Sequence, residues 1–223
     1  MIKVSQLCKS YRDGERKVQV LKDLPLEVPA GRSLAITGPS GSGKSTFLNL
    51  LAGLLVPDSG KIEVTVDNRV TALEQASEKE RTWFRRQRIG YVHQFFNLVP
   101  TLTVWENVAL PGALNKQTDL RERAMAILSA FELDDRANAF PDVLSGGEQQ
   151  RVAVARSILI EPAIVLADEP TGNLDRENTE IVTRLLFGTC HQFATTLVVA
   201  THSMAVAQMA DQHMDLGDST GRA

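Results

Sequence analysis

The sequence predicts an α/β fold with a mainly parallel sheet, an antiparallel β flank and a small helical subdomain. Three observations support this prediction. In the second half of the chain, short apolar strands alternate with helical stretches, which is typical of parallel strands joined by crossover helices. An apolar strand, Ser33–Thr37, leads into a glycine-rich turn and then a helix. Several strand-like stretches fall within the first 30 residues, and these predict the antiparallel flank.

The first part of the chain is interpreted as strands arranged around one helix. Strands are expected at 2–7, 18–21, 24–28, Ser33–Thr37 and 61–66, with a helix at 44–54. The sequence Pro57-Asp58-Ser59-Gly60 is a turn signal just before the last of these strands. No element is predicted for 67–77.

The second part is interpreted as a helical lobe followed by further strands and helices. The residues from about 103 to 160 form the predicted helical subdomain. Helices are expected at 119–131, 148–160, 177–192 and 204–209, and strands at Ile89–Val92, 163–167 and Thr196–Ala200.

The segment Glu78–Arg88 is basic and contains the aromatic residues Trp83 and Phe84. Basic residues interleaved with aromatic ones can indicate nucleic-acid binding. This segment is short and flanked by acids, so a solvated amphipathic helix is favoured. The whole chain carries 24 basic and 27 acidic residues, a net charge of −3, which also argues against a nucleic-acid partner.

The composition is that of an ordinary globular domain, with 43% apolar and 23% charged residues. The two cysteines, Cys8 and Cys190, lie far apart in no metal-binding spacing, and we expect both to be free thiols with structural roles. No apolar run has the length of a signal peptide or a membrane span. We therefore expect any crossing of a bilayer to be made by another chain.

The turn after Ser33–Thr37 fits the pattern G-x-x-x-x-G-K-[ST]. Glycines let the backbone curl so that several N–H groups point at phosphate oxygens, and the following helix adds its positive N-terminal end. Lys44 is expected to reach the β- and γ-phosphates, and the Ser45 hydroxyl to ligate Mg²⁺. The predicted nucleotide-binding residues are Gly38, Pro39, Ser40, Gly41, Ser42, Gly43, Lys44, Ser45 and Thr46.

An apolar strand at 163–167 is followed by two acids, Asp168 and Glu169. Bare carboxylates are costly to bury, so these acids are expected to be paired or metal-bound. Adjacent residues on a strand point to opposite sides, which predicts different roles for the two. Asp168 is expected to hold Mg²⁺, directly or through water, and Glu169 to orient and deprotonate the attacking water.

A second glycine motif, Leu144-Ser145-Gly146-Gly147-Glu148, opens a helix. Ser145 and Glu148 match the S-x-x-E capping box, and a well-capped helix start is the simpler interpretation. The bare N–H groups at Gly146 and Gly147 also predict a second anion site. Together with the phosphate loop and the Asp-Glu strand, in this order and spacing, the stretch resembles the signature sequence of ATP-binding-cassette (ABC) ATPases.

The resemblance covers essentially the whole chain and implies one nucleotide-binding domain, 1–223, with a P-loop NTPase core of the ABC ATPase type. It implies ATP and Mg²⁺ as ligands, and a head-to-tail homodimer in which Ser145, Gly146 and Gly147 act on the nucleotide held by the other copy.

Four further residues take roles from the resemblance. It implies that Tyr11 stacks on adenine, that Gln94 senses Mg²⁺ and water, that Asp175 links the two sites across the dimer, and that His202 contacts the γ-phosphate. His93 stands where a Phe often precedes the glutamine of the family.

The stretch 95–102 and the helical lobe match the groove by which relatives receive their transmembrane permease. The details around Gln94, Trp105 and Thr171-Gly172-Asn173-Leu174-Asp175 are similar to the subgroup of lipoprotein-releasing ATPases, macrolide exporters and the cell-division ATPase. The expected location is the cytoplasmic face of the inner membrane, where the chain would be held peripherally.

The resulting hypothesis is a transport-coupled ATPase in which Glu169, His202, Gln94 and Lys44 promote attack of water on the γ-phosphate. The alternative is an ABC-type regulatory or assembly ATPase without transport, such as the cell-division type. Neither the cargo nor the direction of transport follows from the sequence.

Overall fold

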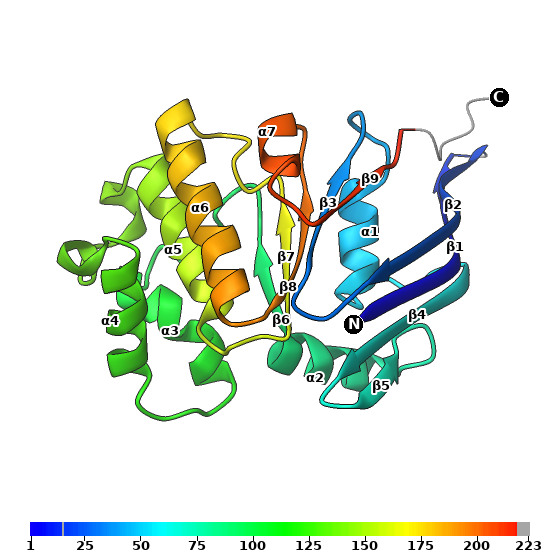
Figure 1. Ribbon diagram of the computed structural model, residues 1–223. Helices are drawn as coiled ribbons and strands as arrows, with labels where there is room; N and C mark the ends of the chain where they lie inside the picture. The colour runs from blue at the N-terminus through cyan, green and yellow to red at the C-terminus, as the bar shows by residue number, and fades with distance from the viewer. Residues whose placement is uncertain (15, 218–223) are drawn as a thin grey trace.

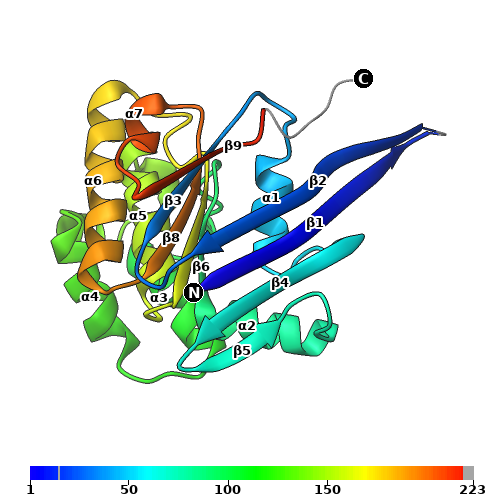
Figure 2. The ribbon, with the colours of Figure 1, turned by 45° about the vertical axis from the view of Figure 1, so that its right-hand side comes forward.

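The computed structural model describes residues 1–14 and 16–217, which form two sheets and their covering helices (Figure 1). The larger sheet has five strands in the order β6-β7-β8-β3-β9, and every neighbouring pair in it is parallel. The smaller sheet has four strands in the order β2-β1-β4-β5, and its pairs are antiparallel (Figure 2). The predicted α/β class, with a parallel sheet and an antiparallel flank, is confirmed.

The parallel strands are β3 (Ser33–Thr37), β6 (Ile89–Val92), β7 (Ile164–Asp168), β8 (Thr196–Ala200) and β9 (Gln212–Asp215). The antiparallel strands are β1 (Ile2–Asp13), β2 (Arg16–Val28), β4 (Ser59–Val66) and β5 (Arg69–Ala72). The α-helices are α1 (Lys44–Leu51), α2 (Glu78–Arg88), α3 (Val104–Leu114), α4 (Leu120–Ala130), α5 (Gly146–Ile158), α6 (Arg176–Gln192) and α7 (Met204–Ala207). Two 3₁₀ turns, η1 (Asp134–Arg136) and η2 (Pro141–Val143), lie between α4 and α5.

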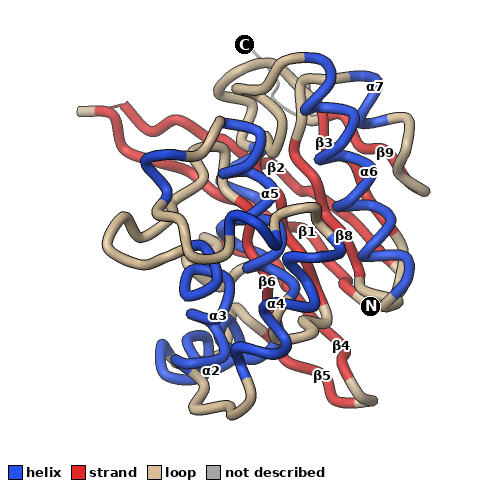
Figure 3. The backbone as a smooth tube through the Cα atoms, turned by 90° about the vertical axis from the view of Figure 1, so that its left-hand side faces the viewer, coloured by secondary structure: helices blue, strands red, loops and turns tan. Residues whose placement is uncertain are grey.

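The parallel sheet separates two apolar cores, and strand β7 shows how. Its side chains alternate, so that Ile164 and Leu166 face one core while Val165 and Ala167 face the other. Helix α1 fills the first core, between the parallel and antiparallel sheets (Figure 2). Helices α3 to α6 fill the second core and cover the opposite face (Figure 3). This double burial explains why the parallel strands are continuously apolar.

Several element boundaries differ from the sequence-based predictions, and the backbone shows why. Strands β1 and β2 run on past the predicted ends because positive φ angles at Gln6 (52°) and Asp23 (46°) bend the strands without ending them. Helix α1 stops at Leu51, three residues earlier than predicted, since Gly53 adopts a left-handed φ of 63°. Strands β5 and β9 were not predicted.

Two expectations about the chain as a whole are tested by the structure. Within residues 1–14 and 16–217, no helix combines the length and the apolar character that a bilayer span requires. Cys8 and Cys190 are both free, and burial raises the pKa of Cys190 to about 12. That thiol is therefore inert at neutral pH.

The parallel arrangement determines where the site lies. The carboxyl ends of neighbouring parallel strands meet at one edge of the sheet, which is where open α/β sheets bind ligands. Strands β6, β7, β8 and β3 end there, and they are followed by Gln94, Asp168-Glu169, His202 and the phosphate loop respectively.

Candidate functional site

The loop from Gly38 to Gly43 requires glycine at two positions for steric reasons. Gly38 and Gly43 have φ angles of 140° and 99°, which side chains rarely tolerate. A Cβ at Gly43 would lie 2.6 Å from Val20 Cγ1, and one at Gly38 would lie 2.7 Å from Ser42 Oγ. The loop therefore takes its tight shape from the sequence itself.

The other loop residues differ in exposure. Pro39, Ser40, Gly41 and Ser45 are exposed, whereas Ser42 is buried. The Ser42 hydroxyl has no hydrogen-bond partner within the described residues. The loop thus presents its outer residues, and Ser45 in the first turn of α1, toward solvent.

Lys44 is buried, with 6% of its surface exposed, and its ammonium group is the centre of the site. Nζ donates to the carbonyl oxygens of Gly38 at 2.9 Å and Pro39 at 3.3 Å. It also lies 3.1 Å from His202 Nε2 and 3.7 Å from Glu169 Oε1. Residues that follow β3, β7 and β8 thus converge on one buried cation.

Asp168 and Glu169 stand at the end of β7 and point to different surroundings. Asp168 Oδ1 is buried and has no hydrogen-bond partner among the described residues. Glu169 has a left-handed φ of 46°, and its amide donates to the carbonyl of Ala200 at 2.9 Å.

His202 closes the site from the end of β8. Its backbone amide donates to Glu169 Oε2 at 3.1 Å, and its Nε2 lies 3.1 Å from Glu169 Oε1. The imidazole is 53% exposed, whereas Glu169 is only 14% exposed. The Glu169 carboxylate therefore accepts from the His202 backbone amide and lies between the imidazole and Lys44.

Gln94 lies two residues after β6, near the turn that follows Glu169. A Cβ at Gly172 would lie 3.5 Å from Gln94 Nε2, and Asn173 Nδ2 donates to the carbonyl of Gln94 at 3.3 Å. Gln94 thus lies beside the loop that carries Glu169.

A fully buried residue that the sequence reasoning missed, Gln150, connects the same two segments. Its Nε2 donates to the carbonyls of Pro170 at 2.7 Å and His93 at 3.5 Å. A polar residue on the apolar face of α5 was the available signal, because a buried amide needs partners.

Tyr11 lies at the open side of the phosphate loop. Its ring is 41% exposed, and its hydroxyl lies 3.3 Å from Thr46 Oγ1 in the first turns of α1. Lys9 Nζ is 5.8 Å from the ring centroid. An exposed aromatic face next to a phosphate loop can accept a flat base.

Ser145, Gly146 and Gly147 begin α5 and do not join this cluster. Ser145 forms the predicted capping box, since its Oγ accepts from the Glu148 amide at 3.3 Å and its own amide donates to Glu148 Oε2 at 2.8 Å. Within the part of the chain that the structure describes, no hydrogen bond or ion pair joins these three residues to the phosphate loop. Their helix N-terminus, the predicted second anion site, is thus not part of the cluster around Lys44.

Asp175 caps α6 next to that second site. Its carboxylate accepts from the Asn178 amide at 2.8 Å, and these hydrogen bonds lower the pKa of Asp175. Asn178 in turn packs against Gly147, where a Cβ would clash with Asn178 Oδ1. Helices α5 and α6 therefore start side by side.

Comparison with known proteins gives consistent results. Residues 21–172 match the family of ABC transporters. An uncharacterised ABC transporter ATP-binding protein of Mycobacterium tuberculosis is 44% identical over 218 residues, which cover 97% of this chain and 86% of the relative. The lipoprotein-releasing system ATP-binding protein LolD of Treponema denticola is 42% identical over 213 residues, or 95% of this chain and 92% of the relative.

Solved structures agree with these relatives. The dimeric ATP-binding cassette MJ0796, in a post-hydrolysis state bound to ADP and Pi, superposes with a TM-score of 0.86 at 38% identity. The match covers 97% of this chain and 95% of that one. The chain belongs to the ABC transporter family and is an ATP-binding, ATP-hydrolysing subunit of that family.

Proposed function

We propose that this chain powers a transporter of the lipoprotein-release or macrolide-export type by closing as a homodimer on ATP. The observation that carries the proposal is the division of the site into two parts. Lys44, Glu169 and His202 converge at the sheet edge, whereas Ser145, Gly146 and Gly147 begin helix α5 outside that cluster. A head-to-tail pair would bring the two parts together across a two-fold axis.

In this proposal the residues at the sheet edge take distinct roles. The loop amides from Gly38 to Thr46 and Lys44 bind the phosphates, and Tyr11 stacks on adenine. Glu169 orients and deprotonates the attacking water, since its carboxylate accepts from the His202 backbone amide and lies 3.7 Å from Lys44 Nζ. His202 contacts the γ-phosphate, and Asp175 links the two sites.

The residues fit a bound Mg²⁺. The buried Asp168 Oδ1, which lacks a hydrogen-bond partner within the described chain, is an oxygen of the kind that Mg²⁺ prefers. Ser45 and Gln94 would supply the remaining protein oxygens. The ion would neutralise charge on the β- and γ-phosphates. Ser45, Gln94 and Asp168 would hold the ion, and through Gln94 its binding would affect the segment after β6.

The permease is proposed to bind in the α2–α3 groove, a hollow of about 320 Å³ between α2, α3, the segment after β6 and the end of α5. Its lining includes Arg86, Asn97, Leu110, Leu114 and Arg156. Phe95, 68% exposed, lies in the segment after β6, between the lining residues His93 and Asn97. Binding there would hold the chain at the cytoplasmic face of the inner membrane, with a permease rather than nucleic acid as its partner.

A membrane pull-down tests the proposal. The Glu169→Gln variant should bind ATP but hydrolyse it at least about 100-fold more slowly, because the base is removed. A tagged form is incubated with ATP and recovered from detergent-solubilised membranes, and mass spectrometry identifies what is bound. A stoichiometric multi-spanning protein supports the transporter, with the Lys44→Ala/Glu169→Gln variant as the control that cannot bind ATP. Recovery of soluble partners alone would favour a regulatory or assembly ATPase, such as the cell-division type.

A further inference from the structure

The amide of Gln150 lies on an otherwise apolar part of helix α5. Gln150 is in the second turn of that helix with none of its surface exposed, and Ala153 and Val154, which follow on the same face, are fully buried as well. A buried amide is tolerated only when its hydrogen bonds are made, whereas a leucine would fill similar space without that requirement. Packing alone thus does not account for glutamine at this position.

Gln150 contacts the backbone beside two residues of the site. Its Nε2 donates to the carbonyl of Pro170 at 2.7 Å and to that of His93 at 3.5 Å. Pro170 directly follows Glu169, and His93 directly precedes Gln94. In the opposite orientation of the amide, Oε1 would face two carbonyl oxygens, so Nε2 is the group that points at them. One side chain of α5 thus reaches the chain next to the proposed base and next to Gln94.

The hydrogen bond to Pro170 holds the turn that carries Glu169. Proline has no N–H, so its carbonyl is the one backbone group through which Pro170 can be held. On either side, the Glu169 amide donates to the carbonyl of Ala200 at 2.9 Å, and the Gly172 amide donates to the carbonyl of Glu169 at 3.1 Å. The amide of Gln150 therefore restrains this turn one residue away from the Glu169 carboxylate.

Helix α5 also holds the segment after β6 at a second point. Arg156, near the end of the helix, donates to the carbonyls of Phe96 at 2.8 Å and Asn97 at 2.7 Å. Gln150 and Arg156 are about 9 Å apart along the helix axis. The segment is thus attached to α5 both before and after Gln94, which leaves the Pro170 contact as the link from the same helix to the base.

Resting on the proposed role of Glu169 as the base, we infer that Gln150 is a positioning residue for ATP hydrolysis. Its amide directs the Glu169 carboxylate by holding Pro170, and it does so without touching the nucleotide. The Oε1 atom of Gln150 is buried and has no hydrogen-bond partner among the described residues, so the donor is the part of the amide that the fold uses. Because a small displacement of a catalytic group lowers the rate strongly, loss of this donor affects the chemical step rather than ATP binding.

The Gln150→Leu variant of the full-length chain tests the inference by steady-state hydrolysis of ATP with Mg²⁺. Its kcat should fall on the order of tenfold or more, while its KM for ATP stays within about twofold of the parent value. Ser157→Ala is the matched control. Ser157 is also buried on α5, but its hydroxyl donates to the carbonyl of Val154 at 2.7 Å, within the helix. That variant should keep its kcat within about twofold of the parent value.

A double variant shows whether Gln150 acts through the base. In the Glu169→Gln background, Gln150→Leu should lower the residual rate by less than about twofold, because the group that it positions is already removed. Thermal unfolding of every variant shows whether the fold is retained at the assay temperature.

Gln150→Glu keeps the shape of the side chain and makes its donor depend on pH. The ionised carboxylate can only accept, and it would face two carbonyl oxygens, whereas the protonated form can donate to Pro170. Burial raises the pKa of such a carboxyl, so the protonated fraction grows as the pH falls from about 8 to about 6. The ratio of its kcat to that of the parent should therefore rise over this range, and the same ratio for Gln150→Leu should stay flat. Glu169, His93 and His202 are present in both chains, so the ratio removes their effect.

The outcomes separate this inference from the proposed function. A kcat for Gln150→Leu near that of the parent, a loss that Ser157→Ala shares, or a KM that rises as much as kcat falls overturns the inference. An equal loss in the Glu169→Gln background, or a ratio for Gln150→Glu that does not change with pH, also overturns it. If Gln150→Leu does not fold, the pH response of Gln150→Glu decides alone. Normal hydrolysis by Glu169→Gln itself overturns the proposed base, whereas a slow Glu169→Gln beside a normal Gln150→Leu overturns this inference only.

Discussion

At the scale of single residues, Gly146 and Gly147 look alike in sequence but have different surroundings. A Cβ at Gly147 would lie 1.9 Å from Asn178 Oδ1, whereas the nearest atom to one at Gly146 is Phe96 Cζ at 3.7 Å. Gly147 is thus required by the packing of α5 against α6. Gly146 is not required by packing, which leaves its N–H group and small size for a partner across the proposed dimer.

Gly147→Ala is therefore expected to destabilise the fold, while Gly146→Ala is not. The first substitution should lower the free energy of unfolding by about 1–3 kcal/mol, because the Asn178 side chain would be displaced and would lose its hydrogen bonds to Asp175. The second should change it by less than about 0.5 kcal/mol. Chemical denaturation of both variants measures the difference, and equal effects would contradict this account.

Tyr11 offers a second test at this scale. Tyr11→Ala should raise the KM for ATP on the order of tenfold, because base stacking contributes about 1–2 kcal/mol. Tyr11→Phe removes only the exposed contact to Thr46 and should leave the KM within about twofold. A KM for ATP that rises equally in both variants would show that the Tyr11 hydroxyl, and not its ring, contributes to ATP binding.

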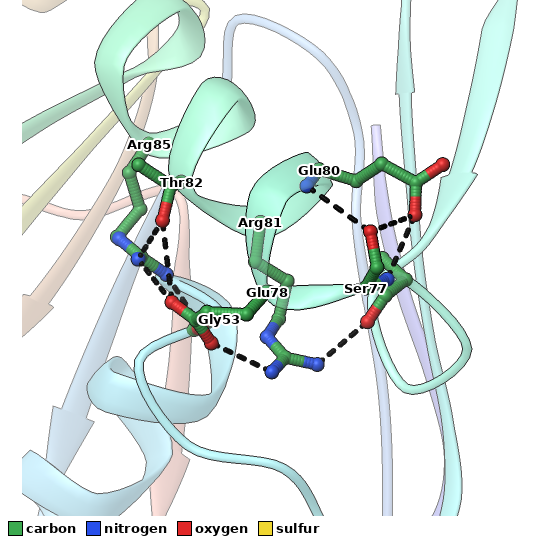
Figure 4. A network of polar contacts seen from close by, with 8 residues as sticks. Gly53, Ser77, Glu78, Glu80, Arg81, Thr82 and Arg85 are labelled. Atoms are coloured by element: carbon green, nitrogen blue, oxygen red, sulfur yellow. Dashed lines mark hydrogen bonds and ion pairs between the residues drawn. The ribbon is translucent and has the colours of Figure 1, made fainter.

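At the scale of elements, α2 is positioned by charge more than by apolar contact. Phe84 is its one buried residue in the described structure. Glu78 instead binds Arg81 and Arg85, and Arg85 donates to the carbonyl of Gly53 at 2.7 Å, beyond the end of α1 (Figure 4). This network orients the helix that lines the groove.

The network predicts a pH dependence. Hydrogen bonds from Arg85, and then Arg81, lower the pKa of Glu78 from 4.5 to about 2. Since the folded pKa is the lower one, the stabilisation is present above about pH 4.5 and is lost as the pH falls toward 2. Glu78→Gln should therefore be less stable than the parent at neutral pH, and the difference should shrink through this window.

The measurement is urea denaturation across that pH range. Glu180→Gln serves as the control, because among the described residues Glu180 pairs with Arg176 alone, which is 94% exposed, and should show a small effect. A difference between Glu78→Gln and the parent that stays constant with pH would contradict the network.

The helices and strands also show how much of the fold could be predicted from the sequence. The bounds of α2 were predicted from its charge pattern, and those of β3 from its apolar run. Strand β5 was missed because Asp67 and Asn68 make its hairpin turn with φ angles of 51° and 60°, in place of a glycine signal. Asp and Asn tolerate the left-handed φ region, so the adjacent Asp67-Asn68 was the sequence signal that could have indicated this turn.

The site residues also divide into those that a local motif identifies and those that it does not. The phosphate loop and the Asp-Glu pair at the end of β7 could be recognised from sequence, because each is a contiguous motif. The parallel sheet then brings the ends of their strands to one edge. Gln150 was not, because its two carbonyl partners, His93 and Pro170, are 57 and 20 residues away in the chain. Contacts of that range depend on tertiary packing, which no local pattern encodes.

At the scale of the whole molecule, the separation of the two anion sites predicts dimerisation that depends on ATP. Glu169→Gln with ATP and Mg²⁺ should elute as a dimer, whereas Gly146→Asp/Glu169→Gln should stay monomeric. The new carboxylate would face the γ-phosphate of the partner's ATP, yet an Asp at the start of a helix is favourable for folding. Size-exclusion chromatography with light scattering measures the mass.

The control for this experiment is the Arg184→Glu/Glu169→Gln variant, which changes charge away from both anion sites and should still dimerise. Thermal unfolding of each variant without ATP shows whether the fold is retained. A dimer formed by the Gly146→Asp variant would place the second anion site outside the interface.

Helix α1, about 12 Å long, connects the phosphate loop with the α2–α3 groove. Lys44 and the phosphate loop are at its start, while Asn49 accepts from Tyr91 and the Gly53 carbonyl from Arg85 near its end. Tyr91 and Arg85 both line the groove. Thermodynamic reciprocity then applies: if an occupant of the groove tightens ATP binding by some factor, ATP tightens the hold on that occupant by the same factor. Retention of ATP and retention of the permease would then strengthen or weaken together.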